Sequence, residues 1–490
     1  MLTAKRLICP ILVVCLVAMC AGCSSGLNNT NVVGNADTLR EAPAGDMPSG
    51  EPPEMSGGSM PQGEPPEMPN GEMPNGKPPE KPGSENGGFM GGVEFTQGTS
   101  ANTIDSDGEI SGAHYTSEED EENALRIDGA DVTLRSVSVN KAAGESRNTE
   151  AGDFYGVNAA LLVTNGASAE ISGASISSSA KNGNGVFSYG EGTRVSISGS
   201  TISTTGDNSG GIQTTGGGTT VAKSLTVTTE GNSSAAIRSD RGGGSVTVTE
   251  GSYRTSGLNS PAIYSTADIS AKTATLSAKN SEALVIEGKN SIELVNCAVY
   301  GCMSKDEGAS SDENVHNVML YQSMSGDADI GTARLDIIGG TLAGDSGDMF
   351  YVTNTHAVIN LSKVSIVNND KSGYLLRVSG NSGTRGWGKV GENGAEVELT
   401  ADAQELDGDI LVDSISTLDI TLKNASSFNG SISILKNSEG HAADENVTVH
   451  IGEGCTWTLT GDCSITTLDN AGLINFNGYS ITLSDGSVLK

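Results

Sequence analysis

Aromatic and basic residues are scarce in this chain of 490 residues. Phe, Trp and Tyr make up 4% of it, and 28 Lys and Arg stand against 60 Asp and Glu, which gives a formal net charge of −32. So few aromatic side chains argue against a large globular core filled with aromatic rings. The negative charge repels nucleic acid and anionic lipid, whose phosphates have the same sign. The composition therefore excludes a nucleic-acid-binding protein.

Long hydrophobic runs are also missing, except near the N-terminus. Residues 7–19 form an apolar stretch that follows two basic residues and is shorter than the ~20 residues needed to span a bilayer. This order is typical of an export signal. The signal ends in Cys20-Ala-Gly-Cys23, which resembles the lipobox of bacterial lipoproteins, although the family usually has Leu at the position of Cys20. The resemblance implies cleavage after Gly22 and a lipidated Cys23; plain secretion with cleavage nearby is the alternative.

Proline is almost confined to one stretch, since 12 of the 14 prolines lie between Pro43 and Pro82. Paired prolines favour the extended polyproline II conformation, and the stretch has too little apolar surface for a core. We therefore expect three parts: a lipoprotein signal peptide at 1–22, a disordered stalk rich in Pro, Gly, Met and Glu at 23–92, and a folded body at 93–490.

Helical stripes of apolar residues are absent after the signal. Short alternations of apolar and polar residues recur instead, each followed by a Gly, Asn or Ser turn, as in Val195-Ser-Ile197 and Leu225-Thr-Val227. Alternation with a period of two residues indicates half-buried strands. The body is therefore predicted to be all-β.

These strands recur at a regular interval. Pairs of a small and an aliphatic residue begin at Gly185, Gly211, Ala236 and Ala262, with spacings of 26, 25 and 26 residues. Strand repeats of this length indicate a solenoid with one coil per repeat. Propeller blades need ~40–45 residues, and sandwiches pair their strands antiparallel. The sequence predicts a right-handed parallel β-helix of roughly twelve coils.

The runs Asn184–Gly192, Ser234–Gly244 and Ser260–Ala267 carry a resemblance as well as a period. They resemble exported bacterial β-helix surface proteins of uncharacterised function that are described as pectin-lyase-like or adhesin-like. The resemblance implies the fold and a cell-surface location, and it supplies no catalytic residues.

Cysteine is rare after the signal, where four residues form two close pairs, Cys297 with Cys302 and Cys455 with Cys463. Neither spacing matches the Cys-x-x-Cys arrangement of zinc or redox sites. An oxidising compartment allows each pair to form a disulfide. Buried free thiols are the alternative.

Motifs for catalysis are missing too. The chain lacks the Asp-Asp, Gly-His-Gly and Arg-Ile-Lys motifs of polygalacturonase-type hydrolases. Glycosidic bond cleavage needs two carboxylates about 5–10 Å apart, and Asp240 with Glu287, two repeats apart, could form such a pair. A polysaccharide lyase or glycoside hydrolase of unrecognised type therefore stays as an alternative, and the catalytic residues are unknown.

A stripe of outward-facing residues is the strongest indication of a ligand. In each repeat the aliphatic residue after the corner points inward, so the next residue and the one two positions later point outward. Several of the scarce aromatic rings fall on this stripe beside charged groups, as in a sugar-binding platform; rings buried by a shifted register are the alternative. The predicted ligand-binding residues are Phe187, Tyr189, Arg238, Asp240, Tyr264 and Glu287.

Together these features predict a non-catalytic binding or adhesion module. Its expected partner is an extracellular glycan or a matrix or surface protein, and its contact with the bacterial membrane is through the lipid anchor alone. A structural rod without a ligand is a further alternative. No organic cofactor is expected, and Ca²⁺ is the ion that the acidic turns would suit. These turns are Glu118–Glu122, Gly326–Asp329, Asp345–Asp348 and Asp407–Asp409.

Overall fold

The computed structural model describes residues 95–304 and 314–490. The expected signal peptide, the lipidation site at Cys23 and the whole of the expected stalk lie outside these residues.

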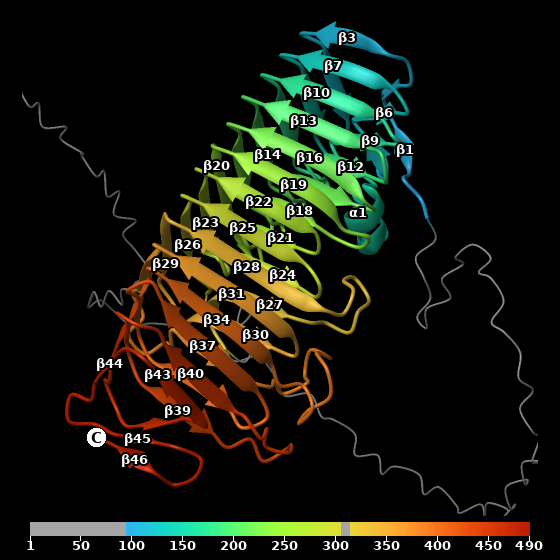
Figure 1. Cartoon of the computed structure of the whole chain (residues 1–490). Coiled ribbons are helices and arrows are strands. Elements are labelled where there is room, and N and C mark those ends of the chain that lie inside the picture. Colours follow the sequence, from blue (N-terminus) through green and yellow to red (C-terminus); the bar gives the residue numbers. More distant parts are fainter. Residues whose placement is uncertain (1–94, 305–313) are drawn as a thin grey trace, which may run out of the picture. The chain divides into compact units, whose positions relative to one another are not determined.

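The described chain winds through three long parallel sheets (Figure 1). Each full coil supplies one strand to each sheet, in the order sheet 1, sheet 2, sheet 3. Residues at equivalent positions of successive coils pair in parallel, as Val186 does with Ile212 and Val195 with Thr220. This arrangement confirms the predicted right-handed parallel β-helix. Its longest sheet has 14 strands, more than the roughly twelve coils expected. The coils vary in length: Ile263 pairs with Leu284, 21 residues further on, and Leu284 pairs with Val318, 34 residues further on.

Sheet 1 has 13 strands and sheet 2 has 14. The strands of sheet 1 are β2 (Thr103–Ile104), β6 (Leu125–Asp128), β9 (Leu161–Thr164), β12 (Val186–Tyr189), β15 (Ile212–Thr215), β18 (Ile237–Ser239), β21 (Ile263–Ser265), β24 (Leu284–Glu287), β27 (His316–Tyr321), β30 (Asp348–Thr353), β33 (Leu376–Val378), β36 (Ile410–Asp413) and β39 (Ile432–Leu435). Those of sheet 2 are β3 (Gly108–Ser111), β7 (Asp131–Arg135), β10 (Ser168–Ser172), β13 (Arg194–Ser198), β16 (Gly218–Lys223), β19 (Gly244–Thr249), β22 (Asp268–Lys272), β25 (Ser291–Val295), β28 (Thr332–Ile338), β31 (His356–Ser362), β34 (Glu396–Asp402), β37 (Thr417–Lys423), β40 (Val447–Ile451) and β43 (Thr467–Asn470).

Sheet 3 has ten strands, and a separate four-stranded sheet follows it in the last coils. The strands of sheet 3 are β4 (His114–Ser117), β8 (Ser138–Lys141), β11 (Ser175–Ser178), β14 (Thr201–Thr204), β17 (Thr226–Thr229), β20 (Ser252–Leu258), β23 (Thr275–Asn280), β26 (Ala298–Gly301), β29 (Thr341–Gly344) and β32 (Ser365–Asn368). The four-stranded sheet contains β35 (Glu405–Asp407), β38 (Ser427–Asn429), β41 (Thr456–Thr458) and β44 (Leu473–Asn475). Shorter pairings involve β1 (Thr99–Ser100), β5 (Glu122–Asn123), β42 (Cys463–Ser464), β45 (Ile481–Thr482) and β46 (Val488–Leu489).

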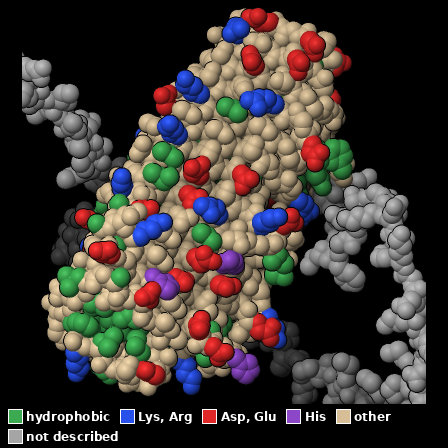
Figure 2. All heavy atoms as spheres, in the orientation of Figure 1, with side chains coloured by type: hydrophobic (Ala, Val, Ile, Leu, Met, Phe, Trp, Pro, Cys, Tyr) green, Lys and Arg blue, Asp and Glu red, His purple; other side chains and the backbone are tan. Residues whose placement is uncertain are grey.

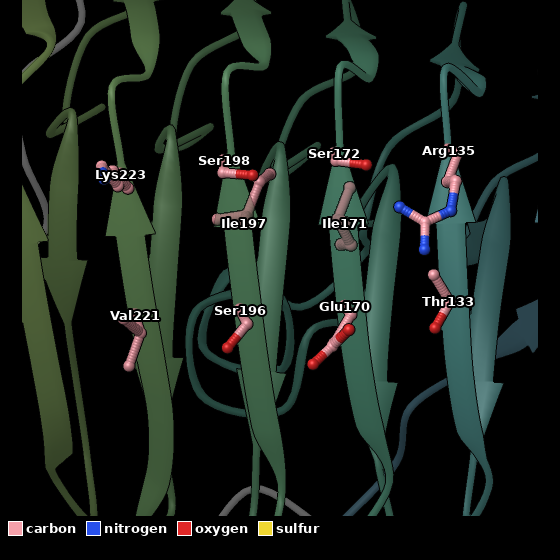
Figure 3. A pocket seen from close by; sticks show the side chains of 10 residues that line it. All are labelled: Thr133, Arg135, Glu170, Ile171, Ser172, Ser196, Ile197, Ser198, Val221 and Lys223. Carbon is pink, nitrogen blue, oxygen red and sulfur yellow. The ribbon is translucent and has the colours of Figure 1, made fainter.

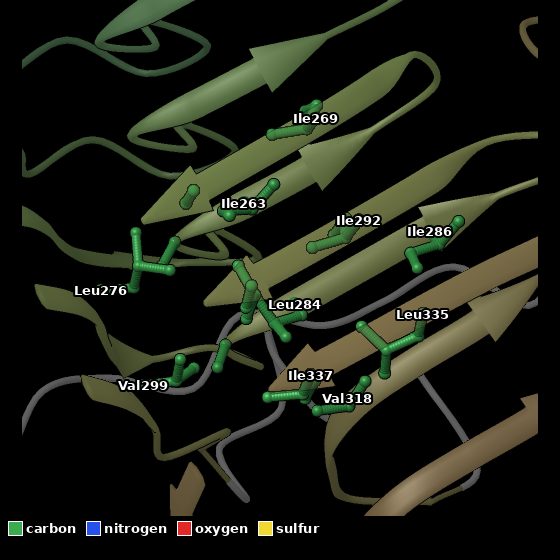
Figure 4. Close-up of a cluster of buried hydrophobic side chains, with 14 of the residues drawn as sticks. Ile263, Ile269, Leu276, Leu284, Ile286, Ile292, Val299, Val318, Leu335 and Ile337 are labelled. Atoms are coloured by element: carbon green, nitrogen blue, oxygen red, sulfur yellow. The ribbon is translucent and has the colours of Figure 1, made fainter. Parts of the chain in front are cut away.

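The core consists of aliphatic side chains that point inward and stack from coil to coil. In Figure 4, Ile263, Leu284 and Val318 come from three neighbouring strands of sheet 1, and side chains of sheets 2 and 3 meet them inside the solenoid. Each of these three side chains is fully buried, and burying such a side chain stabilises a fold by about 1.5–3 kcal/mol. A narrow column of this kind needs few aromatic rings, which explains the composition.

The turn before sheet 1 carries a second ladder, made of serines. The backbone N–H of Ser209 donates to Ser234 Oγ, and the N–H of Ser234 donates to Ser260 Oγ, each at 2.9 Å. These serines are buried, so the hydroxyl groups satisfy backbone donors that water cannot reach. Polar residues inside the repeat therefore fix its register as the aliphatic ones do.

The corner between sheets 2 and 3 contains one residue in the left-handed conformation in many coils. Ser224, Glu250, Thr273 and Asn296 occupy it with φ between 52° and 59°. This conformation costs residues other than Gly, Asn and Asp roughly 1–2 kcal/mol. The corner therefore costs each of these coils some conformational free energy, and the stacking of its strands must compensate for that cost.

The two disulfides considered above do not form. All four cysteines are buried, and none is bonded to another through a disulfide. Cys297 and Cys302 flank the extended strand β26, so their Cα atoms are on the order of 16 Å apart at ~3.3 Å per residue, far beyond the ~7 Å that a disulfide bridges. Cys455 and Cys463 likewise stand on either side of β41. The four thiols belong to the core of the stack.

Candidate ligand-binding cleft

The outer face of sheet 1 carries the stripe that the repeat predicts. The register pairs Phe187 with Gln213, Gln213 with Arg238, Arg238 with Tyr264, and Tyr264 with Val285. These five residues therefore form one column across neighbouring coils. What the column can do depends on the segments that fold over it.

Two of the predicted platform residues are covered by a helix, α1 (Thr149–Tyr155), which the sequence did not predict. Phe187 is 0% exposed and packs against Leu162. A Cβ atom at Gly156, directly after α1, would lie 3.0 Å from Phe187 Cγ, so the chain passes over the ring in close contact. Tyr189 is half-buried, with its ring centroid 5.7 Å from that of Tyr155. The expectation that Phe187 binds a ligand is wrong, because the helix occupies that part of the face.

Side chains of sheet 1 hold α1 in place. The last carbonyl groups of a helix have no partner within it, and here Gln213 Nε2 donates to the carbonyl of Asp153 at 2.6 Å and Thr215 Oγ1 donates to that of Phe154 at 2.7 Å. Arg238 adds a charged contact, since its two terminal nitrogens lie 3.0 Å from the two carboxylate oxygens of Asp153. The helix is therefore fixed to the same strands that carry the predicted site.

Arg238 and Arg241 connect three segments of the fold. Arg238 Nη2 also donates to Asp240 Oδ2 at 2.8 Å. Arg241 Nη2 donates at 2.7 Å to Asp327 in the β27–β28 loop, residues 322–331, and its Cζ lies 4.1 Å from the ring centroid of Phe154 in α1. The helix and the loop are thus tied to the same short segment after β18.

The network around Arg238 and Arg241 contains more carboxylates than guanidinium groups. Burial is the main cause that raises the pKa of Asp240, to about 7; Arg238 opposes the shift, and the nearby charges of Asp153 and Asp327 add to it. Burial likewise raises the pKa of Asp153. Burial, together with three carboxylates that share two guanidinium groups, thus raises the pKa of Asp240 and Asp153 above that of isolated carboxylates.

Glu287 lies below this network and is 1% exposed. Its Oε2 accepts hydrogen bonds from Tyr264 Oη at 2.5 Å and Tyr321 Oη at 2.8 Å, and its Oε1 accepts one from Ser323 Oγ. Burial raises the pKa of both tyrosines well above their usual value, so both hydroxyl groups remain donors. Glu287 anchors the aromatic side chains and does not face open space together with Asp240, as an acid–base pair would require.

An open cleft of about 290 Å³ lies beside the network. Three of the predicted residues, Arg238, Asp240 and Tyr264, line it. Its walls include residues of α1 and of the β27–β28 loop. The full lining is Glu150, Asp153, Phe154, Ser233, Ala235, Arg238, Asp240, Asn259, Pro261, Tyr264 and Asp327.

The sequence did not predict three of the lining residues, Asp153, Phe154 and Asp327, although each lies in a segment that interrupts the strand repeat. Asp153 and Phe154 belong to a seven-residue helix that is too short to show a helical stripe. Asp327 lies in one of the acidic turns that were considered for Ca²⁺. Both segments interrupt the strand repeat, and such an interruption is the signal that could have pointed to them.

Further hollows lie on the outer face of sheet 2. Figure 3 shows a hollow on the outer face of sheet 2, where side chains such as Thr133, Glu170, Ser196 and Lys223 stand on four neighbouring strands. On the face drawn in Figure 2, acidic and basic side chains are interspersed along the strands. Charges spread in this way keep the surface hydrated, and they do not converge on one place as the side chains of a binding site would. The cleft on sheet 1 is the candidate site because three of the predicted ligand-binding residues line it.

Two further features concern ions and membranes. Within residues 95–304 and 314–490, no group of three or more His, Cys, Asp or Glu side chains is arranged to hold a metal ion. In the same part of the chain, no helix has the length and apolar character needed to cross a bilayer.

Comparison with known proteins reaches one solved structure. The fold is similar to a chain in the cryo-EM structure of the Vag8–C1 inhibitor complex, at 13% sequence identity and a TM-score of 0.44. The match covers 78% of this chain and 99% of that chain. No family model matches the chain, and no curated protein matches it in sequence.

Proposed function

We propose that this chain is an exported protein, anchored to the bacterial surface through lipid on Cys23, that binds carbohydrate in the sheet 1 cleft without cleaving it. The observation that carries the proposal is the convergence of Arg238, Asp240 and Tyr264 with two covering segments around one open space. Sugar sites commonly combine an aromatic ring with charged and polar groups held in fixed positions. The hydrogen bonds described above hold these groups in that way.

The environment of Glu287 supports binding over catalysis. A general base must reach the reacting centre directly or through one water molecule. Glu287 accepts three hydroxyl hydrogen bonds beneath the cleft and does not line it. The remaining carboxylates of the network, Asp153, Asp240 and Asp327, are bound to arginines, which suits recognition of a ligand.

The proposal is tested by binding of the full-length chain to a broad glycan array, with and without Ca²⁺. Tyr264→Ala should abolish a saturable signal, because it removes the ring from the cleft, whereas Tyr264→Phe keeps the ring and should retain most of it. Tyr300→Ala is the matched control, since Tyr300 also faces outward but lies in β26 of sheet 3. Binding that survives Tyr264→Ala would place the ligand elsewhere, and an array without signal would contradict carbohydrate binding altogether.

A further inference from the structure

Three aromatic rings meet beside α1 on the outer face of sheet 1. The ring centroid of Phe95 lies 5.1 Å from that of Tyr155 and 5.7 Å from that of Tyr189. The rings of Tyr155 and Tyr189 are also 5.7 Å apart. We call these three residues the aromatic triad. They come from three separate segments: the start of the described body, α1 and β12.

The aromatic triad is open to solvent, unlike the stacked rings of the core. Phe95 is 58% exposed, and Tyr155 and Tyr189 are half-buried. Phe428 and Trp457 also stack on each other, but they are only 1% and 0% exposed. Rings that fill the core are covered in this way, whereas exposed rings gathered at one place can still stack on a ligand.

The aromatic triad adjoins the cleft through consecutive residues of α1. Phe154 lines the cleft, and its ring centroid lies 6.2 Å from that of Tyr155, the next residue. The strands that carry Tyr189 and Tyr264, β12 and β21, are three coils apart in sheet 1, which is about 14 Å at ~4.8 Å per strand. One sugar ring in the cleft would not reach Tyr189, but a chain of several sugar residues would.

Glycine turns connect Tyr189 with the segment that carries Asp240. A Cβ atom at Gly216, which follows β15, would lie 3.0 Å from Tyr189 Cε2. One at Gly242, two residues after Asp240, would lie 2.9 Å from Gly216 Cα. Both glycines have a positive φ, which favours glycine in any case. They also leave this surface without side chains that would block a ligand passing from Tyr189 toward Asp240.

We infer that the aromatic triad is a second stacking site for sugar, and that the cleft and the triad together bind a linear neutral polysaccharide chain instead of a single terminal sugar. This inference rests on the proposed carbohydrate binding and adds the class and length of the glycan. Aromatic rings present an apolar face to the C–H groups of a sugar ring. The triad contains no charged group, and a polyuronate would bring further negative charge to a chain whose net charge is −32.

The test measures binding of the full-length chain to the disaccharides and hexasaccharides of four neutral series, by calorimetry. The series are cello-, chito-, manno- and galacto-oligosaccharides. In at least one series the hexasaccharide should bind about tenfold or more tightly than the disaccharide, because stacking on the aromatic triad adds to binding in the cleft.

Two variants assign this gain with chain length to the aromatic triad. Phe95→Ala and Tyr189→Ala should each remove the gain while leaving disaccharide binding unchanged, and Phe95→Tyr should keep it because it keeps a ring. Tyr479→Ala is the matched control, since Tyr479 is 38% exposed but lies between β44 and β45 in the C-terminal coils. Circular dichroism shows whether each variant is folded, and Phe95→Ala decides if Tyr189→Ala is not.

The outcomes separate this inference from the proposed function. Equal affinity for disaccharide and hexasaccharide, lost in Tyr264→Ala, would overturn the second site and leave carbohydrate binding intact. A gain with chain length that both triad variants retain would place the rest of the glycan elsewhere and would also overturn it. If no hexasaccharide of the four series binds, the inference is wrong, while a signal from another glycan class on the array would keep the proposed function.

Discussion

Replacing Asp240 with Asn should stabilise the folded chain above pH 7. In an ordinary surface pair, removal of a carboxylate beside an arginine weakens the fold. Here burial outweighs Arg238 and raises the pKa of Asp240 from 3.8 to about 7. The charged form of Asp240 is therefore the unfavourable one in the folded chain, and an uncharged amide of the same size avoids it.

The size of the effect follows from the shift. A change of roughly three pKa units corresponds to about 4 kcal/mol at 1.36 kcal/mol per unit. Because Asp153 shares Arg238 with Asp240 and its pKa is also raised, we expect about 2–4 kcal/mol for the single variant. With a folded-state pKa above the unfolded one, the stabilisation is fully present below about pH 4 and is lost as the pH rises through about 7.

The assay is denaturant unfolding of the wild type and Asp240→Asn between pH 4 and pH 8. The two chains should have similar stability near pH 4, where Asp240 is largely protonated in both the folded and the unfolded chain, and the variant should gain progressively up to about pH 7 and level off above it. Asp336→Asn, in the exposed pair with Arg334, should show no such pH-dependent gain. A variant less stable than the wild type at pH 8 would refute the reasoning, because it would mean that Arg238 stabilises the charged carboxylate more than burial penalises it.

Three further predictions concern the rest of the stack. Tyr253→Phe should raise the free energy of unfolding by about 1 kcal/mol, since the Tyr253 hydroxyl is buried without a partner among the described residues and a buried unpaired hydroxyl is unfavourable; a loss of stability in denaturant unfolding would contradict this. Thr273→Asn should also stabilise the chain, by about 0.5–1 kcal/mol, because Thr273 is β-branched at φ 56° where Asn is tolerated; a lower melting temperature would count against the strain. Cys297 and Cys463 should resist a thiol reagent until the chain unfolds, because burial raises the pKa of both thiols, that of Cys463 to about 11; labelling of the native chain at either residue by mass spectrometry would disprove it.

The inward half of the fold was predictable because its pattern is local. A residue such as Ile237 or Ile263 is recognised by its small neighbour and its distance from the previous coil, and the structure places both in the core. The same period fixes the outward column, since a residue after an inward one must face the other way in a strand. Arg238 and Tyr264 followed from this rule alone.

The sequence did not predict in the same way which residues of the outward column would be covered by other segments. Phe187 and Tyr264 are equivalent by period, yet one lies under α1 and the other lines a cleft. The helix interrupts a coil before β9, and its contact with Arg238 joins residues 85 positions apart. The contact of Arg241 with Asp327 spans 86 positions. No local pattern encodes pairs at such distances.

The sequence by itself thus determined the parallel β-helix, its inward column and the outward face on which the cleft lies, because each depends on a period of two residues within strands and about 25 between coils. Only the tertiary structure decided which outward residues are buried, which meet in the cleft and which cysteines stay apart. Those outcomes depend on how irregular segments such as α1 and the β27–β28 loop fold back over the regular stack, where a few hydrogen bonds between distant residues fix their position.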